Sequence, residues 1–146
     1  MSMLANLPEQ ILTKDGMKST KDVLAGKKAV GIYFSAHWCP PCRMFTPILS
    51  KFYNDLKATN PDALEIIFCS SDQDQEAFDE YYGEQPWTSI QYGATEQDDL
   101  GQSFGVRGIP SFQICNVESG AIIDTDGRST VMSNKDSPVG ALSKWA

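Results

Sequence analysis

Two short, almost wholly apolar segments constrain the fold of this chain more than any other feature of its sequence. They are Ala29–Ser35, "AVGIYFS", and Leu64–Ser70, "LEIIFCS". Segments of this length and composition are typical of strands buried on both faces of a sheet. Between them, apolar side chains recur every three or four residues, as on one face of a helix, at Phe45, Ile48, Leu49, Phe52, Tyr53 and Leu56. The sequence therefore predicts a strand, a helix and a second strand at the centre of the fold.

The segments that follow extend this pattern to a sheet flanked by helices. Helices are predicted at residues 74–82 and 96–104, and a hairpin of two strands at residues 111–117 and 121–125. This order predicts an α/β fold in a single domain over residues 1–146. Its central mixed β-sheet is parallel in the middle and antiparallel at its edge.

Other stretches have no clear assignment. Residues 7–13 and 18–24 are short and ambiguous, with a turn expected at Asp15-Gly16 between them. Pro86-Trp87 interrupts the helical pattern, and the tail from Gly127 onward is polar. The sequence therefore does not predict which elements lie at the edges of the fold.

The composition limits the classes of partner and compartment. A net charge of −7 over 146 residues argues against nucleic acid or an anionic membrane as the main partner. The longest apolar block, Ala29–Phe34, is far shorter than the ~20 residues of a membrane-spanning helix. The N-terminal "MSMLANLPEQ" has no basic region followed by an apolar one, so no secretory signal is recognised. We therefore expect a cytoplasmic protein whose thiols are kept reduced.

Two cysteines, Cys39 and Cys42, stand three positions apart where the first predicted strand passes into the helix. Pro40 and Pro41 lie between them, and proline suits the first turn of a helix because its missing N–H is not needed there. Cys39 is then at the positive end of the helix, which stabilises a thiolate, and Cys42 is one turn further on, close enough to form a disulfide. The predicted chemistry is attack by Cys39 on a substrate disulfide and resolution of the mixed disulfide by Cys42. Pro47 is expected to kink this helix.

The cysteine pair has two other interpretations, a metal site and a purely structural role. A zinc or iron–sulfur site usually needs a second pair of ligands. The remaining cysteines, Cys69 and Cys115, are isolated in apolar strands, where we expect them to be buried and inert, and His37 is the single histidine. Redox chemistry is therefore favoured, with no metal and no cofactor besides the cysteine pair itself.

Several segments together resemble the thioredoxin superfamily, and within it the branch of tryparedoxins and nucleoredoxins. The resemblance is carried by "YFSAHWCPPCRMFTP" at residues 33–47, "FCSSD" at residues 68–72 and "GIPS" at residues 108–111. It implies a thioredoxin-like fold and thiol–disulfide oxidoreductase activity.

The same resemblance implies a set of residues that contact substrate. Pro110 matches a cis-proline that faces the active-site disulfide in this family, so we expect a cis Ile109–Pro110 bond. Such a bend exposes the backbone of Ile109 to a substrate segment. Trp38 is expected to form a semi-exposed platform over the disulfide, and we assign it, with Pro40 and Pro41, to substrate binding.

Tyr33 marks a departure from thioredoxin, which carries a buried Asp at this place, although the tryparedoxin-like branch also has Tyr. Another group must then take the proton of Cys42, and water and Asp72 are the candidates. Arg43 and His37 are further candidates for tuning the pKa of the cysteines. The carboxylates after the second strand are predicted to form the solvated face of a helix rather than a metal site: Asp72, Asp74, Glu76, Asp79 and Glu80.

The activity implied by the resemblance is transfer of reducing equivalents from a dithiol such as trypanothione to protein disulfides, for example those of peroxiredoxin-type peroxidases. Residues 71–74, "SDQD", are closer to a nucleoredoxin than to a tryparedoxin, which leaves the reductant open. A nucleoredoxin-like redox regulator and a non-enzymatic, redox-dependent binding module are the alternatives. We expect a monomer.

Overall fold

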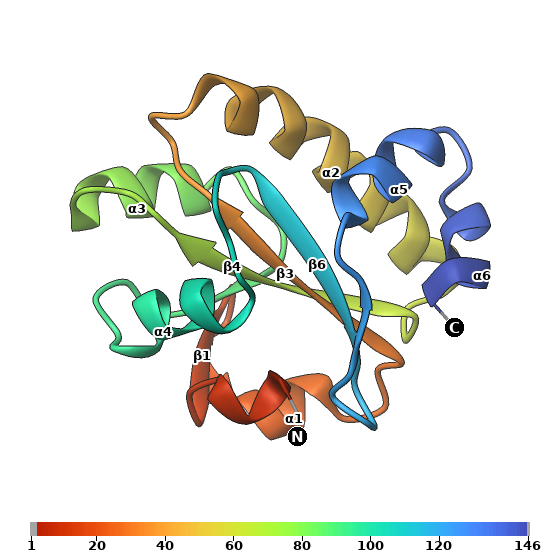
Figure 1. Cartoon of the computed structure of the whole chain (residues 1–146), viewed down its shortest axis with the longest axis horizontal. Helices are drawn as coiled ribbons and strands as arrows, with labels where there is room; N and C mark the ends of the chain where they lie inside the picture. The colour runs from red at the N-terminus through yellow and green to blue at the C-terminus, as the bar shows by residue number, and fades with distance from the viewer. Residues whose placement is uncertain (1–2, 146) are drawn as a thin grey trace.

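A seven-stranded mixed β-sheet forms the centre of the structure, a computed structural model that describes residues 3–145 (Figure 1). The strands lie in the order β2–β1–β5–β4–β3–β6–β7. Their bounds are Gln10–Thr13 (β1), Gly16–Ser19 (β2), Ala29–Ser35 (β3), Leu64–Ser70 (β4), Thr88–Ser89 (β5), Ser111–Asn116 (β6) and Ile122–Asp124 (β7). Strands β3, β4 and β5 run parallel, and the other pairs are antiparallel. The predicted mixed sheet with a parallel centre is confirmed.

Helices cover both faces of this sheet (Figure 1). One face carries α2 (Pro40–Thr59), α3 (Gln75–Tyr82), α5 (Gly127–Ser133) and α6 (Leu142–Trp145), together with the short 3₁₀ helix η2 (Pro138–Ala141). The other face carries α1 (Thr20–Leu24), α4 (Glu96–Ser103) and the 3₁₀ helix η1 (Met3–Asn6). No helix within residues 3–145 has both the length and the apolar character needed to cross a membrane.

The core divides between the two faces because successive side chains of a strand point to opposite sides. Tyr33 and Phe68 belong to the core beneath α2, whereas Ile32 and Ile67 belong to the core beneath α1 and α4. Helix α2 contributes one stripe of its surface to the first core. Of the apolar side chains at the predicted spacing, Ile48 is partly buried and five are buried: Phe45, Leu49, Phe52, Tyr53 and Leu56. Pro47 lies inside this helix, and the kink expected there stays a prediction.

The N-terminal region and β5 complete the sheet. The ambiguous residues 7–13 and 18–24 contain the hairpin of β1 and β2, followed by α1, and Gly16 takes a positive φ of 103° in the turn between the strands. Strand β5 has only two residues and directly follows Pro86-Trp87. It pairs with both β4 and β1, so it joins the hairpin to the central strands.

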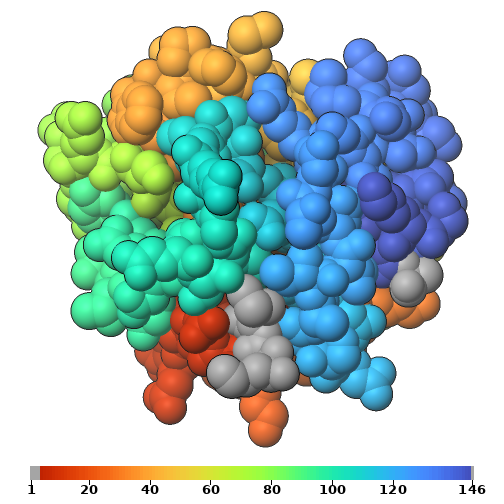
Figure 2. All heavy atoms as spheres, in the orientation of Figure 1, coloured from red at the N-terminus to blue at the C-terminus, as the bar shows by residue number. Residues whose placement is uncertain are grey.

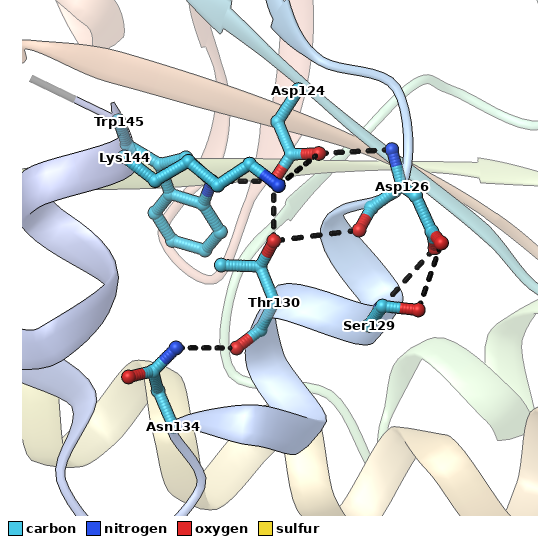
Figure 3. Close-up of polar contacts among 7 residues, drawn as sticks. All are labelled: Asp124, Asp126, Ser129, Thr130, Asn134, Lys144 and Trp145. Carbon is cyan, nitrogen blue, oxygen red and sulfur yellow. Dashed lines mark hydrogen bonds and ion pairs between the residues drawn. The ribbon is translucent and has the colours of Figure 1, made fainter.

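The polar tail from Gly127 is ordered into α5, η2 and α6, and a buried carboxylate fastens it to the sheet (Figure 3). Asp124, the last residue of β7, accepts hydrogen bonds from the Thr130 hydroxyl at 2.6 Å and the Trp145 indole N–H at 2.8 Å. Asp126 caps the N-terminus of α5 by accepting from the Ser129 N–H. Helices α5 and α6 are therefore held by polar contacts with one side chain as well as by apolar packing.

Candidate active site

The cysteine pair lies where β3 ends and α2 begins. Cys39 is the N-cap of α2, Pro40 and Pro41 are its first two residues, and the Arg43 N–H donates to the Cys39 carbonyl at 3.0 Å. The helix therefore begins at Pro40, as predicted from the position of the prolines. This arrangement places Cys39 at the positive end of a helix twenty residues long.

The two sulfur atoms are close to each other but differ in accessibility. They are unbonded thiols separated by 2.6 Å, so little movement is needed to join them. Cys42 is completely buried, and Cys39 exposes a small part of its surface. Of the two, Cys39 is the one that a substrate can reach.

The loop before β6 closes one side of this pair. Figure 2 shows this loop, in teal, lying against the segment around the start of α2, in orange. The Ile109–Pro110 bond is cis, as expected from the resemblance, and the Ile109 carbonyl is 3.9 Å from the Cys39 sulfur. Ile109 also packs against the small cluster that Ala36 forms with the two cysteines. Of the residues predicted to contact substrate, Ile109, Pro110 and the prolines of the helix thus lie at the cysteine pair.

The end of β4 holds the loop that leads to Cys39. The Asp72 carboxylate accepts from the His37 backbone N–H at 2.7 Å and from the Ser70 hydroxyl at 2.6 Å. The Trp38 indole N–H donates to the Ser71 carbonyl at 3.0 Å, while 56% of the Trp38 surface stays exposed. Trp38 is therefore both tethered and accessible, as a platform for substrate requires.

These contacts correct the expectation that Asp72 lies on a solvated face, and its part in taking the proton of Cys42 stays a prediction. It is buried, not on a solvated face, because a backbone N–H and a hydroxyl take up its carboxylate oxygens. The carboxylate holds the loop and makes no hydrogen bond to Cys42. The other carboxylates of that group are exposed, and Asp74 caps α3 by accepting from the Ala77 N–H.

Cys42 is surrounded by hydroxyl groups instead of a carboxylate. Ser35, Tyr81, Thr46 and Tyr33 form a chain, which we call the hydroxyl chain, in which each neighbouring pair of oxygens is 2.6 Å apart. Burial raises the pKa of Cys42 to about 11, helped by its contact with Cys39 and opposed by its hydrogen bonds with the Ser35 hydroxyl and the Ala36 backbone. The sequence pointed to Tyr33 but not to Ser35, Thr46 or Tyr81, because these residues come from three separate elements.

Two of the proposed tuning residues line a cavity of about 380 Å³ beside the hydroxyl chain. The His37 ring is stacked on Tyr81 with centroids 5.1 Å apart, and its Nε2 is 3.5 Å from a carboxylate oxygen of Glu84. Arg43 is exposed at the same cavity. Their effect on the cysteines stays a prediction.

The other two cysteines are buried in β4 and β6, as expected. Burial raises the pKa of Cys69 to about 12 and that of Cys115 to about 11, which disfavours the reactive thiolate. Within residues 3–145, no three His, Cys, Asp or Glu side chains are grouped so that they could hold a metal ion.

Comparison with known proteins identifies the family. The profile of the family described as Thioredoxin-like matches residues 26–122, which contain both cysteines and the cis-proline. The chain belongs to the thioredoxin-like family. It is related to tryparedoxins and nucleoredoxins.

Two curated relatives show how this thioredoxin-like chain relates to each branch. It is 50% identical to probable nucleoredoxin 1 of Arabidopsis thaliana over 100 residues, which cover 68% of the chain but 17% of the relative. It is 38% identical to tryparedoxin of Trypanosoma brucei brucei over 136 residues, which cover 92% of the chain and 90% of the relative. The chain thus spans about a sixth of that nucleoredoxin and nearly all of that tryparedoxin.

Solved structures agree with the tryparedoxin comparison. Native tryparedoxin I from Crithidia fasciculata superposes with a TM-score of 0.84 at 34% identity, covering 93% of this chain and 94% of that one. A structure of tryparedoxin II complexed with glutathionylspermidine gives a TM-score of 0.83 at 32% identity and covers 92% of this chain and 94% of that one. The thioredoxin-like fold predicted from the resemblance is therefore confirmed.

Proposed function

We propose that this chain is a tryparedoxin-like thiol–disulfide oxidoreductase that passes reducing equivalents from a dithiol to protein disulfides. The observation that carries the proposal is the pair of thiols 2.6 Å apart at the start of α2, one partly accessible and one buried. Such a pair alternates between dithiol and disulfide without a further cofactor, and we propose that none is needed.

The reaction follows from this asymmetry. The Cys39 thiolate attacks one sulfur of a substrate disulfide, and the other substrate sulfur leaves as a thiolate and takes up a proton. Cys42 then loses its proton and attacks the Cys39 sulfur, which releases the second substrate thiolate and leaves the Cys39–Cys42 disulfide. A dithiol donor reduces that disulfide by the same two exchanges in reverse and is itself oxidised to a disulfide, so two electrons pass in each direction.

The charges around the pair favour a partner that presents carboxylates. Two of the three arginines of the chain lie on the segments that meet at the cysteines: Arg43 follows Cys42, and Arg107 lies two residues before Ile109. The third, Arg128 on α5, has its guanidinium 5.8 Å from the ring centre of Phe45 on α2. The chain as a whole carries a net charge of −7, so this grouping is local. A glutathione-type dithiol such as trypanothione fits through its γ-glutamyl carboxylates, as does a protein with acidic residues beside its disulfide, such as a peroxiredoxin-type peroxidase. The related tryparedoxin II complexed with glutathionylspermidine supports a donor of this class.

Three cysteine variants test the proposal with insulin as the disulfide substrate and trypanothione, glutathione or dithiothreitol as the donor. Cys39→Ser should abolish insulin reduction, because no attacking thiolate remains. Cys42→Ser should trap a mixed disulfide through Cys39 that is visible by mass spectrometry. Cys69→Ser is the matched control, since a hydroxyl can still donate to the Gln97 carbonyl that Cys69 contacts at 3.2 Å. Turnover by Cys39→Ser would contradict the proposed chemistry.

The same experiment separates the alternatives. A higher rate with trypanothione than with glutathione supports the tryparedoxin-like assignment, and equal rates favour a nucleoredoxin-like regulator, for which the 50% identity to a nucleoredoxin is the supporting observation. Retained partner binding without turnover by any donor indicates a binding module. We further propose that the chain acts as a monomer in the cytoplasm, which light scattering and localisation of the tagged protein test.

A further inference from the structure

The hydroxyl chain is buried, and its hydrogen bonds have a direction. Thr46 donates to the Cys42 carbonyl at 2.9 Å, because a carbonyl oxygen only accepts. With its proton used in this way, Thr46 accepts from both tyrosine hydroxyls, 2.6 Å away. Tyr81, having donated to Thr46, accepts from Ser35, also at 2.6 Å. The Ser35 oxygen is then left with a lone pair for the Cys42 thiol, its neighbour.

The two middle members of the hydroxyl chain reach the cavity of about 380 Å³. Both Tyr81 and Thr46 line this cavity, together with His37 and Glu84. The Ser50 hydroxyl, which is buried and has no hydrogen-bond partner within residues 3–145, lines it as well. A polar cavity with such groups suits ordered water, because buried hydroxyls normally find a partner. Hydrogen-bonded oxygens thus connect the buried thiol to a polar space beside an imidazole and a carboxylate.

We propose that Ser35 and Tyr81 conduct the proton of Cys42 to this cavity when Cys42 resolves the mixed disulfide, and that Thr46 and Tyr33 hold the Tyr81 hydroxyl in place. The proposal rests on the function proposed above and adds the route of its proton. As the Cys42 sulfur attacks Cys39, its proton passes to Ser35, and the Ser35 proton passes to Tyr81. Tyr81 then releases to solvent in the cavity the proton that it otherwise donates to Thr46. The bond between Cys39 and the substrate sulfur breaks, and that sulfur leaves with the electron pair.

The surroundings of Cys42 favour a neutral relay. The titratable groups that face it are Cys39 on its own helix, Tyr33 on β3 and Tyr81 on α3. Burial raises the pKa of both tyrosines, so their hydroxyls stay protonated and pass a proton without storing a charge. The groups able to accept a proton, His37 and Glu84, lie at the cavity.

Release of thionitrobenzoate from one equivalent of dithionitrobenzoate separates the two steps. The first release reports attack by Cys39, and the second reports resolution by Cys42. For Tyr81→Phe and Ser35→Ala, we expect the first release to stay within about twofold of the wild type. We expect the second to slow at least about tenfold at neutral pH, because general base assistance typically contributes 10²–10⁴-fold. The second release in these variants should also rise steeply with pH, and its solvent deuterium isotope effect should fall.

Tyr82→Phe is the matched control. It lies next to Tyr81 on the same helix and is also buried, but its hydroxyl donates to the Trp87 carbonyl at 2.6 Å and is not part of the hydroxyl chain. The proposal is overturned if the second release keeps its wild-type rate and pH profile in both variants, or if Tyr82→Phe slows it equally. Slowing with an unchanged pH profile also overturns it, since that indicates lost positioning alone. If Tyr81→Phe does not fold, Ser35→Ala decides. A first release that survives Cys39→Ser instead contradicts the proposed function.

Discussion

Two buried polar clusters in this protein differ in charge, one being centred on a carboxylate and the other made of neutral hydroxyls. Around Asp124, a charged carboxylate accepts three hydrogen bonds, from Thr130, Trp145 and the Asp126 N–H, and lies 3.6 Å from the Lys144 amine (Figure 3). Around Cys42, neutral hydroxyls bond to one another and no carboxylate hydrogen-bonds to the thiol.

The difference follows from what each cluster has to do. A buried carboxylate is stable only while all its partners stay in place, so it fixes the position of every group that bonds to it. At Asp124 those groups belong to α5 and α6, and the result is a fastened tail. Neutral hydroxyls can reverse their hydrogen bonds with little change in charge, and this suits a place where a thiol gives up and regains its proton. A buried charge therefore suits a cluster that holds helices in place, and a chain of neutral hydroxyls suits a cluster that transfers a proton.

Removal of the Asp124 carboxylate gives the largest expected effect. Asp124→Ala leaves a buried hydroxyl, an indole N–H and a backbone N–H without their acceptor, so the free energy of unfolding should fall by about 3–5 kcal/mol. Denaturant titration measures the loss, and hydrogen exchange of the Trp145 indole N–H should show that α6 detaches first. The first thionitrobenzoate release by Cys39 should persist, because the cysteines lie outside this cluster.

Asp126→Ala is the control for that variant. It removes a carboxylate from the same loop, but Asp126 is exposed and caps α5 through Ser129, so the cost should be about 1 kcal/mol. Equal losses in the two variants would show that Asp124 does no more than cap a helix.

Low pH should weaken the contribution of the Asp124 cluster to stability, and high pH should weaken that of the Cys42 cluster. Burial tends to raise the pKa of Asp124, but hydrogen bonds from Thr130, Trp145 and Asp126, with Lys144, outweigh it and hold the pKa below the usual range. Its contribution to stability is therefore present above the ordinary carboxyl pKa and is lost as pH falls through the folded value. The pKa of Cys42 is raised to about 11, so its contribution is present below the ordinary thiol pKa and is lost as pH rises toward 11.

Unfolding curves over a range of pH test this pair of statements. Asp124→Asn should reduce the loss of unfolding free energy at low pH only. Cys42→Ser should reduce part of the loss at high pH only. The second effect should be on the order of 2 kcal/mol, since one pKa unit corresponds to about 1.4 kcal/mol. If either variant changed both sides equally, the two clusters would not titrate independently.

The contrast also explains what the sequence could predict. Strands β3 and β4, helix α2 and the cysteine pair were predicted because each is encoded within a short segment, as an apolar run, a helical spacing or a motif. Asp72 was misplaced because it adjoins a run of exposed carboxylates, whereas its burial is set by the His37 N–H, 35 residues earlier.

Long-range contacts account for the other gaps. Strand β5 has two residues, too few for a pattern, and exists because β4 and β1 both pair with it. The helices of the tail were not predicted, because the residue that orders them, Asp124, lies outside the tail. It accepts hydrogen bonds from Thr130, six residues later, and from Trp145, 21 residues later. Ser35 and Tyr81 are 46 residues apart, so no local spacing reveals the hydroxyl chain.

The smallest expected effect comes from Lys144, and it tests whether the charge or the hydrogen bonds hold the tail. The Lys144 side chain is 55% exposed, although its Asp124 partner is buried. An exposed amine loses little by separating from a carboxylate, because water and salt screen the attraction. Lys144→Ala should therefore lower the free energy of unfolding by at most about 1 kcal/mol, and the difference should shrink in 1 M salt. A loss as large as that of Asp124→Ala would show that the ion pair, and not the three hydrogen bonds, fastens α6.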